Sequence, residues 1–311
     1  MRAIVMLIVC ATLVSAQDGG FQLRVDVPLV SVDVSVTDSN GRPVSTLTKD
    51  DFLVFEDGVP HNIQNFSPVE IPYNVLLLFD CSGSTKPQQA LMLTAMRRLI
   101  SRLRAQDVIA IAQFGTSVDL RLDWKPRNTQ GVDVELGTYA GCDNTDFYGA
   151  LDWSARKMSG VAGRKGVVVY TDGLGPMPMR GSRPVDSVDD PAFQKVLQTA
   201  RASRASFNFV AIDTDLNPRA GTPVSMIYTL QQARARMEQL ADASGGRMVF
   251  PKSDEDVIPM YEQIGRELET SYSIGYVSSN VGKESRFRTI EVRLRDETLK
   301  VRQSRTGYAA P

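Results

Sequence analysis

The feature that most restricts the fold of this chain is an uninterrupted apolar run, Val75 to Phe79, that leads directly into Asp80. Such a run is typical of a strand buried on both faces of a parallel sheet. Segments with helical periodicity then alternate with further apolar strands up to residue 268. We predict an α/β domain over residues 70–268, with a doubly wound, mostly parallel sheet of about six strands. The helices are expected near Lys86–Arg104, Phe147–Met158, Pro191–Ala205, Met226–Ala243 and Asp254–Glu269, and the later strands near Val108–Phe114, Val118–Trp124 (antiparallel, at an edge), Gly166–Tyr170, Phe207–Ile212 and Arg247–Phe250.

Both ends of the chain outside this domain have the two-residue periodicity of β-strands. In residues 21–69, valines at positions 30, 32, 34 and 36 alternate with polar residues, and a hairpin with a turn at Asp57-Gly58 follows. Residues 269–311 contain three further strand patterns, Tyr272–Tyr276, Thr289–Leu294 and Lys300–Arg302, without helices to cover them. We therefore predict that the two ends form one small β-sandwich, into which the α/β domain is inserted.

Residues 1–16 have the three parts of a secretory signal peptide. Met1-Arg2 is followed by an apolar run from Ala3 to Val14, and Val14-Ser15-Ala16 supplies the small residues of a cleavage site. The run is shorter than the roughly 20 residues of a transmembrane helix. Cys10 lies inside it after Val9, which disfavours lipidation. We expect a secreted or periplasmic protein with no integral membrane segment once the signal is removed.

Composition excludes several classes of site. The 311 residues include 35 Lys and Arg, 36 Asp and Glu and one histidine, His61, with a formal net charge of −1. Without a basic excess, the sequence does not indicate nucleic-acid binding. A single histidine, which we expect in a solvated loop, excludes a His-rich zinc site and leaves one candidate base for a Ser-His-Asp arrangement.

Three loops at the predicted sheet edge contain oxygen donors. They are Asp80-Cys81-Ser82-Gly83-Ser84, Cys142-Asp143-Asn144-Thr145-Asp146 and Thr171-Asp172-Gly173. Open α/β sheets bind ligands at the carboxyl ends of their strands. Together the loops offer the carboxylates and hydroxyls of Asp80, Ser82, Ser84, Thr145 and Asp172, a set that suits Mg²⁺ and also Mn²⁺ or Ca²⁺. We predict an octahedral cation site whose open position accepts an acidic group, the alternative being a metal-free set of polar caps. Asp143 and Asp146 are interpreted as loop and helix N-cap residues.

These donors resemble the metal-ion-dependent adhesion site (MIDAS) of the von Willebrand factor type A (VWFA) domain, over residues 70–268. The flanks, from Val34-Ser35-Val36-Thr37-Asp38 to Phe55-Glu56-Asp57-Gly58 and from Tyr272-Ser273-Ile274-Gly275-Tyr276 to Arg305-Thr306-Gly307-Tyr308, are similar to the bacterial VWFA-related family of acidobacteria. The sequence departs from that family at Cys81, where a small or threonine-like residue is usual. That position is not a ligand in the motif. The resemblance implies the VWFA fold and a divalent cation.

Cys81 and Cys142 are the two cysteines that remain after signal cleavage. Cys81 lies between two proposed ligands, and Cys142 precedes Thr145 by three positions. If a cation draws these loops together, the Cα atoms fall within the roughly 4.4–6.8 Å that a disulfide requires. Export provides an oxidising compartment. We predict a Cys81–Cys142 disulfide, the alternative being two separately buried thiols.

The sequence favours a binding protein over an enzyme. The leading hypothesis is a secreted adhesion module that binds a carboxylate on a protein or other macromolecule through its cation. One alternative is a periplasmic assembly scaffold with a purely structural ion. Another is a phosphatase-like hydrolase with Asp80 as nucleophile, but such sites commonly have a second carboxylate at the position occupied here by Ser82. Ser82 also lacks the G-x-S-x-G elbow of serine hydrolases.

Two irregular segments and one helix face complete the sequence-based expectations. Leu174–Asp190 and Thr214–Val224 are interpreted as partner-recognition loops, because long irregular loops at a ligand-bearing edge are often functional. The alternative is that they are flexible surface excursions. Arg234, Arg236 and Glu238 are interpreted as a solvated helix face.

Overall fold

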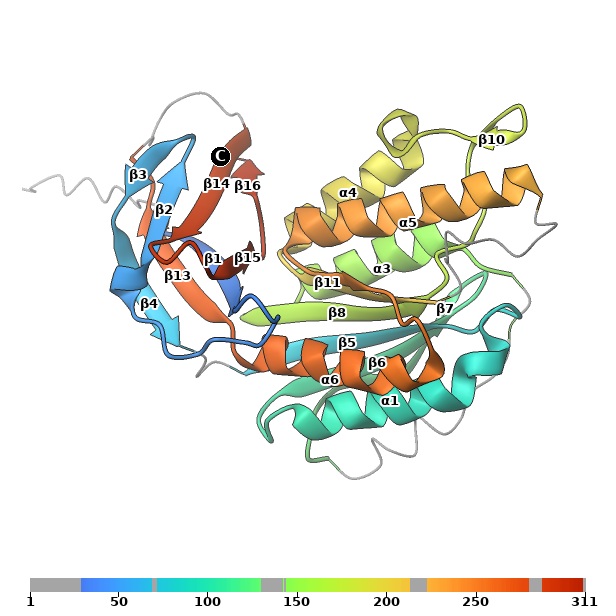
Figure 1. Ribbon diagram of the computed structural model, residues 1–311, viewed down its shortest axis with the longest axis horizontal. Helices are drawn as coiled ribbons and strands as arrows, with labels where there is room; N and C mark the ends of the chain where they lie inside the picture. The colour runs from blue at the N-terminus through green and yellow to red at the C-terminus, as the bar shows by residue number, and fades with distance from the viewer. Residues whose placement is uncertain are drawn as a thin grey trace, which may run out of the picture.

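A computed structural model describes residues 29–68, 72–129, 142, 144–212, 223–279 and 287–309. The predicted signal peptide, Asp143 and residues 214–222 of the second predicted recognition loop lie outside the described residues. The described chain forms a layered α/β part and a β-sandwich that lie next to each other (Figure 1). Across these residues, no helix is both long and apolar enough to span a membrane.

The α/β part is built on a six-stranded sheet of order β12-β11-β8-β5-β6-β7. All neighbouring strands are parallel except β6 and β7, so the edge strand β7 is antiparallel, as predicted. The strands span Tyr73–Asp80 (β5), Val108–Phe114 (β6), Val118–Pro126 (β7), Arg164–Thr171 (β8), Ser206–Ala211 (β11) and Met248–Val249 (β12). Val75 to Phe79 of β5 are at most 1% exposed, as expected of a strand covered on both faces.

Helices cover both faces of this sheet (Figure 1). They span Gln89–Arg102 (α1), Phe147–Ser159 (α3), Pro191–Ser203 (α4), Val224–Ser244 (α5) and Asp254–Glu269 (α6). One core lies between the sheet and α1 with α6, and a second core lies between the sheet and α3, α4 and α5. The helix expected from Lys86 is in part a 3₁₀ turn, Lys86–Gln88, before α1 begins.

Strands from both chain ends form the sandwich, which confirms the inserted arrangement. One antiparallel sheet has the order β15-β1-β13-β4 and the other has the order β16-β14-β2-β3. The strands span Leu29–Thr37 (β1), Phe52–Glu56 (β2), Val59–His61 (β3), Ile63–Pro68 (β4), Tyr272–Val277 (β13), Phe287–Leu294 (β14), Lys300–Gln303 (β15) and Gly307–Ala309 (β16). Alternate residues of β1 and β14 face a common apolar core. A short 3₁₀ turn, Lys49–Asp51 (η1), precedes β2.

The expectation for His61 is wrong in one respect. His61 ends strand β3 instead of lying in a solvated loop. Its ring lies 5.1 Å from the ring of Tyr276, centroid to centroid, and its Nε2 is 3.1 Å from the Ser279 hydroxyl. The Asp57-Gly58 turn before β3 has positive φ at both residues, the geometry of a tight hairpin.

Candidate metal site

The first loop of the predicted site begins where β5 ends. The Asp80 side chain is fully buried, and its two carboxylate oxygens are held from two directions. The Ser82 backbone N–H donates to Oδ1 at 2.9 Å, and the Thr171 hydroxyl, at the end of the neighbouring strand β8, donates to Oδ2 at 2.8 Å. The Thr85 hydroxyl closes the loop by donating to the carbonyl oxygens of Asp80 and Ser82.

The two serines of this loop present their hydroxyls together. The Oγ atoms of Ser82 and Ser84 are 3.0 Å apart. Ser82 is 5% exposed, whereas Ser84 is exposed. The loop therefore places a buried carboxylate beside a hydroxyl pair that extends toward the surface.

The third loop continues from β8 and places a second carboxylate near the first. Asp172 is 2% exposed, and its Oδ1 accepts the Leu174 N–H at 2.9 Å. Gly173, with φ of +70°, is required here, because a Cβ atom would lie 2.7 Å from the Met237 methyl group. The Gly173 N–H donates to the Thr171 hydroxyl, so this loop and Asp80 are joined through one threonine.

Burial sets the electrostatics of this edge. Burial, together with the nearby Asp172 carboxylate, raises the pKa of Asp80 to about 6, even though the hydrogen bonds from Ser82 and Thr171 act to lower it. Two nearly inaccessible carboxyl groups in this position repel each other when both are ionised. A divalent cation relieves that repulsion. The oxygen-only donor set also fits a hard cation. Separately, the described residues contain no cluster of three or more His, Cys, Asp or Glu side chains that could hold a metal ion.

The second loop is tied covalently to the first. Cys81 and Cys142 form a disulfide with a Cα separation of 5.3 Å, which confirms the predicted pairing. The Cys142 N–H also donates to the Cys81 carbonyl at 2.9 Å. These bonds bring the segment that contains Thr145 to the same sheet edge. Thr145 is partly exposed, and its role as a ligand stays a prediction.

Asp146, which follows Thr145, has the structural role expected of it. It is the N-cap of α3, and its carboxylate accepts the Gly149 N–H at 2.9 Å. Its own N–H donates to the Gly115 carbonyl at the end of β6. The start of α3 is thus fixed against the sheet.

Two positioning residues were not predicted. Thr171 belongs to the T-D-G motif, and its hydroxyl connects Asp80 to Gly173. Thr85 is fully buried, and its hydroxyl donates to two carbonyl oxygens of the first loop. The signal in the sequence is the position of each threonine: Thr85 directly follows the first loop, and Thr171 is the first residue of the third.

The solvated helix face predicted on α5 is wrong for Arg236. Arg236 is fully buried and forms an ion pair with the equally buried Asp190, at 3.1 Å from Nη2 to Oδ2. It also donates to the Tyr148 hydroxyl and to the Val185 carbonyl. Arg234 and Glu238 do lie on the surface, where they pair with each other. The apolar positions 233, 237 and 240 share the face of Arg236, so the helical period contained this information.

The same ion pair anchors the first predicted recognition loop. Residues 174–190 contain a small hairpin, Met179–Arg180 (β9) with Arg183–Pro184 (β10), and a 3₁₀ turn, Ser187–Asp189 (η3). Asp190 then caps α4 by accepting the N–H groups of Ala192 and Phe193. Met179 and Val188 are 51% and 69% exposed, so the loop presents apolar side chains to solvent from a fixed base.

Comparison with known proteins identifies the fold. No protein-family model matches the sequence, and no curated protein matches it. A solved von Willebrand factor type A protein from Catenulispora acidiphila is 10% identical over 88% of this chain and 74% of its own length, with a TM-score of 0.50. Protein BatB from Bacteroides thetaiotaomicron is 14% identical over 64% of this chain and 100% of its own, with a TM-score of 0.45. Proximal thread matrix protein 1 from the mussel byssus, solved with a zinc-occupied MIDAS motif, is 11% identical over 68% of this chain and 49% of its own length, with a TM-score of 0.47. Taken with the strand order and the antiparallel edge strand, the first of these similarities shows that residues 73–269 have a VWFA-like fold, carried on a β-sandwich from both chain ends.

Proposed function

We propose that this protein is an extracytoplasmic binding module that uses a divalent cation at its D-x-S-x-S edge to recognise a carboxylate on a macromolecular partner. The observation that carries the proposal is the convergence of loops at the carboxyl ends of β5 and β8. There Asp80 is buried, accepts bonds from both loops and lies near a second buried carboxylate, Asp172. A hydroxyl pair adjoins it on the solvent side.

The donors divide by chemistry. Ser82, Ser84 and Thr145 would hold the cation through hydroxyl oxygens, and Asp80 and Asp172 would bind it directly or through water. The two carboxylates roughly neutralise a divalent ion, with Mg²⁺ the first choice and Mn²⁺ or Ca²⁺ the alternatives. Such an ion supplies Lewis acidity toward an oxygen ligand. The chain's own contribution is to keep these donors fixed, through Thr171, Thr85 and the disulfide, and to leave the solvent side open.

Location and organisation follow from the same features. The disulfide is typical of an oxidising compartment, and together with the predicted signal peptide it supports a secreted or periplasmic site. We assign residues 21–69 and 269–311 to the sandwich and 70–268 to the VWFA domain, and we place the protein with the bacterial VWFA-related proteins of acidobacteria that its flanks resemble.

Isothermal titration with MgCl₂ and MnCl₂ tests the cation site on the chain from Gln17 onward. We expect one ion to bind and Asp80→Ala to abolish binding. Asp146→Asn is the matched control, because asparagine caps a helix as well as aspartate and removes one charge beside the site. The control should bind like the unchanged protein. Absence of Mg²⁺ and Mn²⁺ binding, or equal binding by Asp80→Ala, would reject the proposal.

A capture experiment from the native secretome separates the functions. Capture that is lost both with EDTA and in Asp80→Ala supports carboxylate recognition through the cation. Capture that survives both favours a scaffold with a structural ion. Turnover of a generic phosphate ester that Asp80→Asn abolishes would instead favour the hydrolase. Free acetate as competitor should reduce the EDTA-sensitive capture, because it offers the same carboxylate oxygens.

A further inference from the structure

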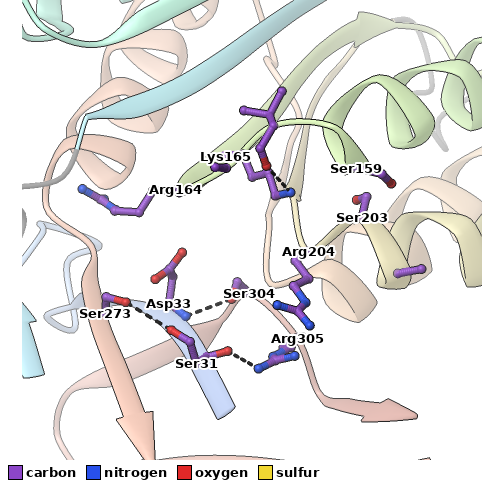
Figure 2. Close-up of a pocket in the computed structure, with 14 residues that line it drawn as sticks. Ser31, Asp33, Ser159, Arg164, Lys165, Ser203, Arg204, Ser273, Ser304 and Arg305 are labelled. Carbon is purple, nitrogen blue, oxygen red and sulfur yellow. Dashed lines mark hydrogen bonds between the residues drawn. The ribbon is translucent and has the colours of Figure 1, made fainter. Parts of the chain in front are cut away.

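A hollow of about 520 Å³ lies at the other end of the central sheet, where the α/β layers meet the sandwich. The start of β8 and the end of α4 line one side of the hollow (Figure 2). Strands β1 and β13 and the chain before β16 line its other side. Its volume is within the range of roughly 300–1,000 Å³ that is usual for small-molecule sites. Every residue that lines it belongs to the described part of the chain.

The hollow has a strong excess of positive charge. Four cationic side chains line it, and a single carboxyl group, that of Asp33, faces them. The cations are Arg164 and Lys165 at the start of β8, Arg204 just after α4, and Arg305 before β16. This concentration contrasts with the chain as a whole, whose formal net charge is −1.

The protein itself fixes the buried members of this group in place. Arg305 is 4% exposed, donates to the Ser31 carbonyl, and lies over the Tyr308 ring. Its Nε has no hydrogen-bond acceptor among the described residues. Arg164 is 2% exposed, lies over the Tyr73 ring and donates to a backbone carbonyl. Arrangements of this kind preorganise positive charge before any ligand arrives.

Arg204 lines the same hollow from the surface. The backbone conformation at this position favours glycine and does not call for an arginine. It is exposed, and its φ of +58° lies in the left-handed region that favours glycine at the end of a helix. Figure 2 shows Arg204 close to Arg305. Burial and the charge of Arg204 lower the pKa of both Lys165 and Arg305, that of Arg305 to about 10. The cations therefore repel one another, and an anion between them would relieve that repulsion.

We propose that this hollow binds the phosphate or sulfate group of a small molecule, with Arg204 and Arg305 as its direct contacts. Guanidinium groups bind tetrahedral oxyanions through forked pairs of hydrogen bonds. The volume exceeds that of the bare ion, so we expect the oxyanion to be carried as an ester on a larger polar molecule. The site does not depend on the cation site, because β8 starts here and ends at Thr171, about 23 Å away at 3.3 Å per residue.

Titration of the chain from Gln17 in the presence of EDTA tests the site, using inorganic phosphate, glucose 6-phosphate and glucose as probes. We expect both phosphates to bind, glucose 6-phosphate more tightly, and glucose not to bind. Arg204→Gly should weaken phosphate binding about tenfold or more, the loss expected for a charge-assisted hydrogen bond. Because glycine tolerates the positive φ, this variant should melt at the same temperature or higher.

Arg201→Ala is the matched control, since Arg201 is an exposed arginine on the last turn of α4 that does not line the hollow. It should bind phosphate like the unchanged protein. Amide NMR shifts on phosphate addition should concentrate at residues 159–165, 202–205 and 304–305. Absence of phosphate binding, an equal loss in both variants, or equal binding of glucose would overturn the proposal. A tighter affinity for inorganic phosphate than for the ester would overturn its assignment to a small-molecule ester.

Discussion

One strand, β8, joins two sheet edges of opposite chemical character. It starts with Arg164-Lys165, beside the basic hollow, and ends with Thr171, directly before Asp172 of the acidic edge. At the acidic edge, buried carboxylates accept hydrogen bonds from nearby loops. At the basic edge, buried guanidinium groups donate to carbonyls and lie over tyrosine rings. Both edges concentrate like charges, which costs free energy unless a ligand of opposite charge binds.

The edges differ in how the chain brings their residues together. The three acidic loops each follow or precede a regular element of one domain, and a disulfide joins two of them. The basic hollow instead combines residues from the two chain ends with residues from the inserted domain, such as Ser31 and Arg305 with Arg204. The first edge is thus a property of one fold. The second exists only because the sandwich docks on it.

The largest effect is expected from breaking the buried ion pair between Arg236 and Asp190, which anchors the 174–190 loop near the acidic edge. Arg236→Ala leaves the Asp190 carboxylate buried without its cation and also removes the bond to Tyr148. We expect the free energy of unfolding to fall by about 3–5 kcal/mol, the usual cost of removing one partner of a buried pair. Urea denaturation followed by circular dichroism measures it.

Arg234→Ala is the control for that change. Arg234 lies two positions earlier on the same helix and pairs with Glu238 at the surface. Its removal should cost less than about 1 kcal/mol, because exposed pairs contribute little. Similar losses in the two variants would show that the buried pair contributes no more to stability than the exposed one.

The fold was largely predictable because the pattern of apolar residues along each strand reflects how many of its faces are buried. Val75 to Phe79 is continuous in apolar character since helices cover both sheet faces, and β14 alternates since only one of its faces meets the sandwich core. The D-x-S-x-S and T-D-G motifs each follow a predicted strand, so their meeting at one edge followed from the parallel order. The disulfide followed from the same geometry.

The remaining features depend on contacts between distant residues. Nothing near Arg236 in the sequence identifies Asp190, which lies 46 positions away, although the helical period placed Arg236 on the buried face. The basic hollow joins Ser31 to Arg305 across 274 positions. A charged side chain is assigned to solvent by default, and only the tertiary structure shows that rings and carbonyls cover it.

A smaller effect is expected from removing the link between the first two acidic loops. The double variant Cys81→Ala/Cys142→Ala opens a loop with a sequence separation of 61. We expect a loss of about 2–4 kcal/mol in the free energy of unfolding, mainly because the unfolded chain gains freedom. Mg²⁺ affinity should fall as well, whereas phosphate binding at the basic edge should not change.

Reduction provides the control for the cysteine variant. Dithiothreitol should destabilise the unchanged protein by a similar amount and leave the double variant unaffected. Thiol titration of the denatured, unreduced chain from Gln17, which lacks Cys10, should find no free thiol. Two free thiols would contradict the disulfide, and an equal loss of phosphate binding would contradict the independence of the two edges.

The smallest effect concerns Asp33, the one carboxyl group that lines the basic hollow. Burial raises its pKa, against the lowering influence of Arg164, Arg305 and Lys165 and of the Ser273 hydroxyl. When ionised, it repels an incoming anion; when protonated, it does not. The affinity for sulfate, which does not itself titrate in this range, should therefore rise as the pH falls through the raised pKa of Asp33, and Asp33→Asn should bind severalfold more tightly at pH 7 with no such dependence.

The contribution of Asp33 to the free energy of unfolding should also rise as the pH falls. Asp33 can therefore be tested without any ligand. A raised carboxyl pKa means that the folded state holds the proton more firmly than the unfolded state, whose value is near 3.8. The protonated Asp33 side chain contributes fully to stability below the unfolded-state pKa. This contribution is lost as the pH rises through the folded-state pKa. Asp33→Asn should remove this portion of the pH dependence, seen as a difference between the two proteins in urea denaturation from pH 4 to 8. Identical pH profiles for the two proteins would show that the cations around the hollow offset the effect of burial on the pKa of Asp33. An ionised Asp33 would then already neutralise part of the positive charge of the basic edge.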